Sequence, residues 1–179
     1  MRAWHKTFGL NVITTNCSNN YGPKQNPEKL IPLTIINAIN GKKIPLYGDG
    51  SNIRDWLYVM DHCEGIYKTL LRGKTGEVYN IGGNNEKTNK YIVNKICSIL
   101  DDVFPVEKNK NMPKNMNSYS ELIENVKDRP GHDFRYSIDT TKIKEQLNWE
   151  PAETFDSGIL KTVNWYIENL DRFKDSSLD

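Results

Sequence analysis

The stretch N-C-S-N-N-Y-G-P-K-Q-N-P-E-K-L-I-P, residues 16–32, joins a strand pattern to a polar loop bounded by prolines. The preceding run, Asn11 to Thr15, is rich in β-branched residues, which is typical of a strand packed on both faces. Asn19 and Asn20 then offer uncharged donors and acceptors. Ligands of open α/β sheets bind beyond the carboxyl ends of the strands, so this loop is a candidate binding site. The same residues fit equally well an Asx-type turn that only ends the strand.

The size and composition of the chain restrict its class. Its 179 residues suit one domain with a core of its own. The net charge of +1 comes from interspersed acids and bases, which excludes nucleic acid and anionic membranes as expected partners. Three cysteines without C-x-x-C spacing indicate neither a disulfide framework nor a metal site. Without a signal peptide or a long apolar run, we expect a soluble, cytoplasmic protein.

Short strands alternate with helices along the rest of the chain, which indicates an α/β fold. We expect strands at 43–47, 53–59 and 77–81, helices at 2–8, 30–40, 61–72, 89–100, 141–147 and 155–170, and a frayed tail from Asp171 to Asp179. Asp61 is placed to cap the helix at 61–72. The apolar spacing predicts that the inner face of this helix is formed by Cys63, Ile66, Tyr67, Leu70 and Leu71.

Two charged groups of residues are candidate binding elements. Arg54 and Asp55 interrupt a strand pattern, so either they pair with one another or Arg54 faces an anionic ligand; periodicity alone favours the pair. The sequence Asp128-Arg129-Pro130-Gly131-His132 predicts a rigid turn that presents polar side chains, which a salt-bridged surface turn would also explain. His62 is expected to be structural.

Residues 106–125 are dense in Lys, Asn, Ser and Met and have little apolar periodicity. This composition predicts a mobile loop. The basic stretch from Lys108 to Lys114 is diluted by asparagines and acids, so we do not expect it to bind RNA.

Four segments together resemble the dTDP-glucose 4,6-dehydratases, a family of the extended short-chain dehydrogenase/reductases. They are residues 16–32, Y-G-D-G-S-N-I-R-D-W-L-Y-V-M-D-H at 47–62, Y-N-I-G-G-N-N-E-K-T-N at 79–89 and D-R-P-G-H-D-F-R-Y at 128–136. The resemblance runs from about Arg2 to about Leu170. Members of this family carry a Gly-x-x-Gly-x-x-Gly fingerprint and a Tyr-x-x-x-Lys pair in a strand-loop context that this sequence lacks. The resemblance therefore implies the C-terminal part of such an enzyme.

The implied fold is the C-terminal portion of an NAD-dependent nucleotide-sugar epimerase/dehydratase. Residues 1–40 and about 53–82 would contribute the last Rossmann strands, beside a smaller mixed α/β substrate domain. The implied substrate-binding residues are Asn19, Lys29, Leu30, Pro45, Leu46, Tyr47, Arg54, Asn89, Asp128, Arg129, Pro130, Gly131 and His132. Asn20 would reach the NAD cofactor. No catalytic or metal-binding residue is assigned to this chain.

The implied reaction converts dTDP-glucose to dTDP-4-dehydro-6-deoxyglucose and water, in the synthesis of deoxysugars such as rhamnose. We expect the parent enzyme to be a homodimer that binds a dTDP-sugar, and this chain alone to be inactive. Two alternatives stay open: a related nucleotide-sugar epimerase or decarboxylase, and a module that binds nucleotide sugars without catalysis.

Overall fold

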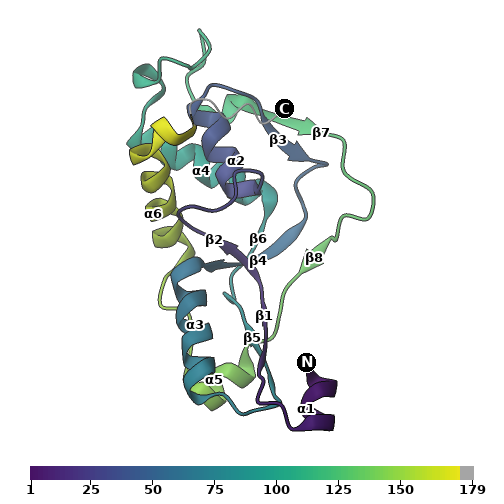
Figure 1. The fold of residues 1–179 in the computed structure, drawn as a ribbon. Coiled ribbons are helices and arrows are strands. Elements are labelled where there is room, and N and C mark those ends of the chain that lie inside the picture. Colours follow the sequence, from purple (N-terminus) through teal and green to yellow (C-terminus); the bar gives the residue numbers. More distant parts are fainter. Residues whose placement is uncertain (174–179) are drawn as a thin grey trace. The chain divides into compact units, whose positions relative to one another are not determined.

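The computed structural model describes residues 1–173, which form two compact units. Unit 1 comprises residues 1–20, 54–86 and 136–155, and unit 2 comprises residues 21–53, 87–135 and 156 onward. Figure 1 shows the elements of both units. The assignment of residues 1–40 and about 53–82 to a dinucleotide-binding type of fold stays a prediction.

Unit 1 is built on a parallel strand pair, β1 (Thr14–Cys17) and β5 (Val78–Ile81), with Thr14 opposite Val78. Helices α3 (Val59–Arg72) and α5 (Thr141–Leu147) pack against β5, and α1 (Arg2–Phe8) precedes β1. The core of this unit consists of apolar side chains that are almost fully removed from water: Leu57, Tyr79, Ile81, Ile143, Leu147 and Trp149. Tyr79 also donates its hydroxyl to Gln146 of α5 at 3.1 Å, which fixes the helix on the strand.

Unit 2 contains a second parallel pair, β3 (Ile44–Tyr47) and β7 (Ile123–Val126), with Tyr47 opposite Val126. Helices α2 (Leu30–Ile39) and α4 (Asn89–Val103) pack against each other and against β3. The 3-10 turns η1 (Val106–Lys108) and η2 (Tyr119–Leu122) follow α4, and α6 (Phe155–Glu168) leads to η3 (Leu170–Phe173). Buried side chains on α2, α4 and α6 form the core, among them Ile31, Ile35, Ile92, Ile96, Ile159 and Val163.

The boundaries between the two units fall inside the remaining strands. These strands are β2 (Asn19–Tyr21), β4 (Ile53–Tyr58), β6 (Glu86–Thr88) and β8 (Arg135–Tyr136), and each contains residues of both units. Helix α6 does the same at its first residue. Among the helices of residues 1–173, none has the length and apolar character that crossing a bilayer requires.

Two predictions about α3 were wrong. The helix begins at Val59 with Tyr58 at its N-cap, so Asp61 lies in the first turn, where its buried carboxylate accepts a hydrogen bond from the backbone N–H of Glu153. The side of α3 that is buried carries Asp61, Gly65 and Thr69. The predicted inner residues Cys63, Ile66, Tyr67, Leu70 and Leu71 are all exposed. The apolar spacing correctly placed these side chains on one face of the helix, but it could not show that this face is exposed.

The region around the first strand also differs from the prediction. β1 begins at Thr14, and its residues Thr15 to Cys17 are exposed rather than packed on both faces. Asn19 and Asn20 belong to the short strand β2 and not to a loop. At the other end of the chain, Leu170–Phe173 forms a 3-10 turn, so fraying of Asp171 to Phe173 stays a prediction, and the rest of the predicted frayed tail lies outside the described residues.

Part of the predicted mobile loop at 106–125 is anchored. The buried side chain of Asn109 donates to the backbone carbonyl of Ile39 at 3.0 Å and to the hydroxyl of Tyr119 at 3.2 Å. Tyr119 in turn donates to the carbonyl of Phe104 at 2.8 Å. A capping box at Ser118 and Glu121 begins η2. Both ends of the segment therefore have fixed contacts, and its mobility stays a prediction for the residues between them.

Candidate functional site

The turn at residues 128–132 is organised by one carboxylate. Asp128 Oδ1 accepts from the backbone N–H of Arg129 at 2.8 Å and lies 2.7 Å from Nδ1 of His132, whose side chain is buried. The hydrogen bond from His132, followed by that from Arg129, lowers the pKa of Asp128. Gly131 adopts a φ of +69°, a conformation that a residue with a Cβ rarely takes. Asp128 and His132 thus shape the turn.

Arg129 is left as the free cation of this turn. Its side chain is exposed, and within residues 1–173 its guanidinium has no ion pair or hydrogen bond. A planar guanidinium suits a phosphate because it can donate two parallel hydrogen bonds. Pro130 fixes one backbone angle and Gly131 accommodates the positive φ that the turn requires, so the turn is suited to presenting one cation to an anionic ligand.

Unit 2 brings the 128–132 turn together with two other predicted segments. Asn125 Nδ2 donates to the carbonyl of Gly48 at 2.6 Å, and the Asp128 side chain lies beside Gly48, directly after β3. The turn after β3 also meets the start of α4, where the backbone N–H of Asn89 donates to the carbonyl of Asn52 at 2.9 Å. Tyr47, Asn89 and the 128–132 turn therefore surround one edge of unit 2.

Only some side chains of β3 are accessible at this edge of unit 2. Ile44 and Leu46 are buried, whereas Pro45 is half-buried and Tyr47 is exposed, because alternate side chains of a strand point to opposite faces. The side chain of Leu46 therefore belongs to the core, and only its backbone remains for a ligand. Lys29 is exposed at the N-cap of α2, and Leu30 is the first helical residue. Their role in binding stays a prediction.

The other predicted site residues lie in unit 1. Asn19 and Asn20 are half-buried in β2, and Asn20 Nδ2 donates to the carbonyl of Ser18 at 3.0 Å. Arg54 is 8% exposed in β4. Asn20 lies in β2, the strand that follows the carboxyl end of β1, and a parallel sheet places its ligands beyond that end of its strands.

Asp55 has partners that the sequence did not indicate. Its fully buried carboxylate accepts from the backbone N–H groups of Gly83 at 2.9 Å and Asn85 at 2.7 Å. A Cβ on Gly83 would lie 2.0 Å from the carbonyl oxygen of Trp56, so only glycine fits this loop. The charge of Asp55 is thus balanced by a loop 28 residues away, and its presence in the strand does not require Arg54. In the sequence, only the Gly82-Gly83 pair after a strand pattern hinted at a loop that could approach the Asp55 carboxylate.

A Tyr-x-x-x-Lys spacing does occur in α4, at Tyr91 and Lys95. Lys95 Nζ lies 2.9 Å from Asp156 Oδ1, and this hydrogen bond raises the pKa of the lysine. A lysine that assists a tyrosinate is instead expected to be free to face it. Lys95 is therefore a surface ion-pair residue, and we assign no catalytic role to Tyr91.

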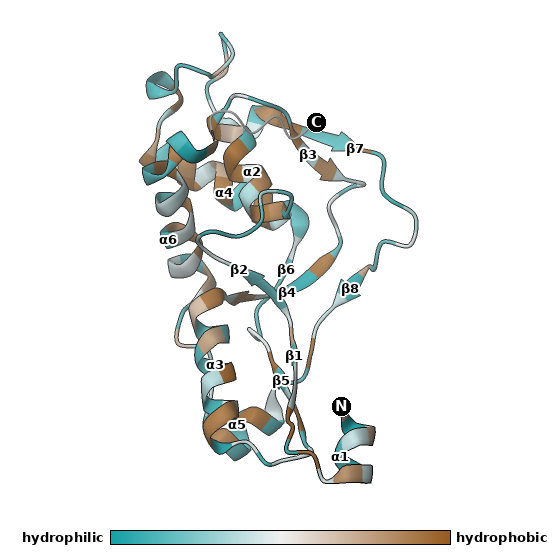
Figure 2. Cartoon of the chain, in the orientation of Figure 1, coloured by the Kyte–Doolittle hydropathy of each residue, from teal (hydrophilic) through white to brown (hydrophobic). Residues whose placement is uncertain are grey.

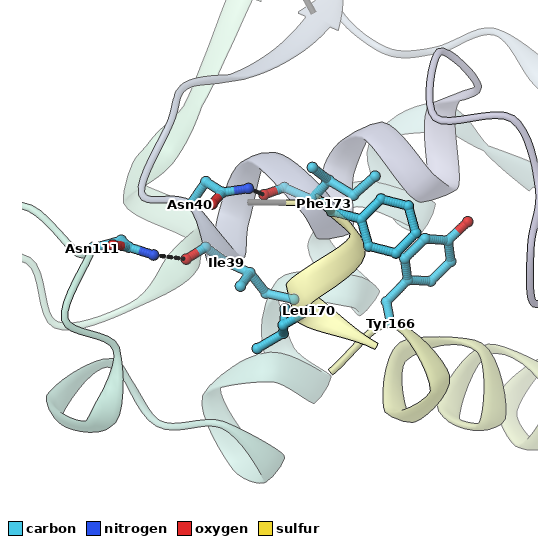
Figure 3. A pocket seen from close by; sticks show the side chains of 7 residues that line it. Ile39, Asn40, Asn111, Tyr166, Leu170 and Phe173 are labelled. Carbon is cyan, nitrogen blue, oxygen red and sulfur yellow. Dashed lines mark hydrogen bonds between the residues drawn. The ribbon is translucent and has the colours of Figure 1, made fainter. Parts of the chain in front are cut away.

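The cavities within each unit do not coincide with these residues. In unit 2, a cavity of about 40 Å³ is lined by Ile36, Ile39, Asn40, Asn111, Tyr166, Leu170 and Phe173 (Figure 3). Its volume suits about one or two waters and not a nucleotide. In unit 1, a cavity of about 440 Å³ borders the amino end of β5, whereas ligands of this type of sheet bind at the carboxyl ends of the strands. Its Lys142 already pairs with Glu77 at 2.7 Å. Across residues 1–173, no three His, Cys, Asp or Glu side chains gather as a metal site.

Comparison with known proteins identifies the family. The profile of a family described as GDP-mannose 4,6 dehydratase matches residues 1–162. The chain therefore belongs to this family of sugar-nucleotide dehydratases.

The relatives with high sequence identity to this chain include dTDP-glucose 4,6-dehydratases. The chain is 56% identical over 169 residues to a dTDP-glucose 4,6-dehydratase of Shigella flexneri, a match that covers 94% of the chain and 44% of that protein. A crystal structure of dTDP-glucose 4,6-dehydratase from Bacillus anthracis in complex with NAD is 50% identical with a TM-score of 0.81, over 95% of this chain and 49% of that one. The enzyme from Streptomyces venezuelae, also solved with NAD, is 43% identical with a TM-score of 0.82, over 97% and 49%. The chain spans about half the length of these relatives.

Proposed function

We propose that this chain is the C-terminal, nucleotide-sugar-binding part of a dTDP-glucose 4,6-dehydratase. The observation that carries the proposal is the turn at 128–132, where Asp128 and His132 hold the backbone and leave the Arg129 guanidinium free. The identity of 43–56% to dehydratases of this specificity supports the choice of reaction. Solved epimerases such as that of Thermotoga maritima, at 23% identity, share only the fold.

In this proposal, each predicted residue binds or orients the substrate. Arg129, Arg54 and Asn19 bind the diphosphate through charge-assisted and amide hydrogen bonds. Pro45, Tyr47, Lys29 and Leu30 border the nucleoside. Asn89 and the 128–132 turn close the pocket. Binding these remote groups holds the hexose in one orientation, which is how an enzyme lowers the entropic cost of reaction.

NAD would accept and return a hydride while water leaves the hexose, giving dTDP-4-dehydro-6-deoxyglucose. Asn20 fits a minor share of its binding, because the residue lies beyond the carboxyl end of β1, in β2, but its amide already donates to the backbone carbonyl of Ser18. We therefore propose that the chain by itself neither binds NAD specifically nor turns over dTDP-glucose. A module that only binds nucleotide sugars is the second candidate, because the residues proposed here contact substrate and none of them is assigned a catalytic role.

The test is calorimetric titration of the purified chain with dTDP-glucose. Arg129→Ala should weaken binding by about tenfold to hundredfold, the range for losing hydrogen bonds between a guanidinium and a charged oxygen. Arg72→Ala, an exposed arginine at the end of α3, is the matched control and should leave binding unchanged. Equal binding by the wild type and Arg129→Ala would refute the assigned role of the turn.

Turnover separates the two candidates. The chain is mixed with NAD, dTDP-glucose and the part of the Bacillus anthracis enzyme that it does not match, and formation of the 4-keto product is followed. The dehydratase proposal expects product only in the complete mixture. A chain that binds dTDP-glucose but never supports turnover in a formed complex would be a binding module.

A further inference from the structure

The cavity in unit 1 is lined by basic side chains that the proposed function does not use. Its volume of about 440 Å³ lies within the range of small-molecule sites. Arg2, His5 and Lys6 line it from α1, and Lys142 lines it from α5. Figure 2 shows both hydrophilic and hydrophobic colouring along α1. Because residues three and four apart share one face of a helix, the basic face of α1 borders the cavity.

The walls of this cavity are held together by segments that are distant in the sequence. The backbone N–H of Gly76 donates to the carbonyl of Val12 at 2.7 Å. The ring of His5 packs against Gly76, where an added Cβ would lie 2.4 Å from Nε2. Nδ1 of the same ring lies 2.8 Å from the carbonyl oxygen of Leu10. Helix α1 is thus fixed on the loop before β5, and a cavity that is already formed lowers the cost of ordering on binding.

The charges that line the cavity do not balance. Glu77 is the one acidic residue of the lining, and its carboxylate lies 2.7 Å from Lys142 Nζ. The hydrogen bond from Lys142, followed by the charge of that lysine, lowers the pKa of Glu77, so the pair is ionised and neutral as a whole. Within the described part of the chain, the exposed side chains of Arg2 and Lys6 have neither an ion pair nor a hydrogen bond. Two cations at the cavity are therefore left without a counter-charge.

We propose that this cavity is a second binding site, which takes a small phosphate monoester that carries hydroxyl groups. A phosphate monoester has a charge of about −1.5 to −2 at neutral pH, which matches the two cations Arg2 and Lys6. The guanidinium of Arg2 can donate two parallel hydrogen bonds to its oxygens. The cavity is larger than a phosphate group, and Thr75 with the Glu77–Lys142 pair offers polar partners for the hydroxyl groups.

This inference goes beyond the proposed function, because none of the proposed dTDP-sugar residues lines the cavity. The proposed ligand binds at the amino end of β5, whereas Asn19 and Asn20 lie beyond the carboxyl end of β1. The second site therefore binds its ligand independently of the dTDP-sugar.

The test is titration of the full chain with glucose 6-phosphate, followed by the amide resonances in NMR spectra. We expect saturable shifts at residues 75–78 and along α1, no shifts with glucose, and weaker binding of inorganic phosphate. Lys6→Ala should weaken binding by about tenfold, because a charge-assisted hydrogen bond is lost, and Lys6→Arg should restore it. Lys114→Ala is the matched control, since it removes the same charge from an exposed lysine of unit 2 that does not line the cavity.

Folding of the variants is checked by circular dichroism. Lys6 is exposed, so Lys6→Ala should melt with the wild type; if it does not, Arg2→Ala replaces it. Shifts confined to other residues, an equal loss in Lys114→Ala, or equal affinity for inorganic phosphate and glucose 6-phosphate would overturn the proposal.

A second titration separates this site from the proposed function, because dTDP-glucose also carries phosphate groups. Glucose 6-phosphate should bind with the same affinity when the chain is saturated with dTDP-glucose, and Lys6→Ala should bind dTDP-glucose as the wild type does. Displacement of glucose 6-phosphate by dTDP-glucose would overturn the proposal of a second site. A chain that binds glucose 6-phosphate at residues 75–78 but does not bind dTDP-glucose would refute the proposed function and leave the second site standing.

Discussion

The two units of this chain differ in how completely they bury their own apolar surface. In unit 2, α2, α4 and α6 direct most of their isoleucines and valines inward, and the exposed large apolar residues, such as Tyr47 and Val103, lie on different elements. In unit 1, the core around Trp149 covers one side of α3, while the other side and α1 remain exposed. The difference indicates that, among residues 1–173, unit 2 buries its apolar side chains more completely than unit 1 does. Four predictions test this contrast.

The largest expected effect is on the core of unit 1. Trp149 is 1% exposed and contacts the backbone of α3 at Gly65. Trp149→Ala should lower the free energy of unfolding of unit 1 by about 3–5 kcal/mol, because a large buried side chain is replaced by a cavity. Urea unfolding is followed by fluorescence and by amide exchange in both units. Unit 2 should retain its protection.

The control for this change is another tryptophan of the same unit. Trp4 on α1 is exposed, so Trp4→Ala should change the free energy of unfolding by less than about 0.5 kcal/mol. Equal losses for the two variants, or loss of protection in unit 2 together with unit 1, would remove the distinction between the units.

The second prediction concerns the two faces of α3. A Cβ on Gly65 would lie 2.7 Å from Ile81 Cγ2 and 3.1 Å from the Trp149 ring, so Gly65→Ala should destabilise by about 1–2 kcal/mol despite its better helix propensity. Leu70→Ala should be nearly neutral in the isolated chain, since that side chain is exposed. Thermal unfolding of both variants gives the comparison. A larger loss for Leu70→Ala would mean that the apolar face is buried in solution.

The faces of α3 also show where sequence reasoning fails. The 3.6-residue spacing correctly located a helix at this place, as it did at α2, whose end near Asn40 was predicted. Burial depends on what packs against the helix, and here Trp149 and Ile81 approach so closely that only Gly65 fits. The strands β3 and β5 were predicted because their turns are local. The partners of Asp55 could not be predicted, because its loop lies 28 residues further along the chain.

In the candidate site, too, local features were predicted and features that depend on long-range packing were not. The turn at 128–132 was predicted because Pro130 fixes one backbone angle and Gly131 permits a positive φ within the same five residues, and the structure adds that Asp128 and His132 hold it. The burial of Leu46 could not be predicted from the sequence, because it depends on how β3 packs against α2 and α4. Local backbone chemistry could thus be predicted from the sequence, whereas which side chains remain free for a ligand could not.

The third prediction tests unit 2 at its least regular segment. Asn109→Ala should cost about 1–3 kcal/mol, because the carbonyl of Ile39 and the hydroxyl of Tyr119 both lose a donor from a buried side chain. Asn117→Ala, at an exposed position, is the control. In hydrogen exchange, residues 114–116 should exchange fast and Tyr119 slowly. Slow exchange throughout 114–116 would refute the predicted mobility of this part of the loop.

The smallest expected effect is the pH dependence that Tyr119 gives to unit 2. Burial, as the largest cause, raises the pKa of Tyr119 to about 12 from the ordinary value of 10.0. A raised pKa means that the folded state holds the phenolic proton more tightly, so this contribution to stability is complete below about pH 10 and is lost as the pH rises toward 12. Tyr119→Phe has no phenolic proton at this position, so this loss of stability at alkaline pH should disappear in the variant.

The measurement is the free energy of unfolding of wild type and Tyr119→Phe across the alkaline range. At neutral pH the variant should be weaker by about 1 kcal/mol, because the hydrogen bonds to Phe104 and Asn109 are lost. The difference should shrink above about pH 10. Burial also raises the pKa of Cys97 and of Tyr166 to about 12, but both residues are present in the two proteins and cancel in the difference. A difference that stays constant from neutral to alkaline pH would show that Tyr119 is solvated and that the anchored end of this segment opens in solution.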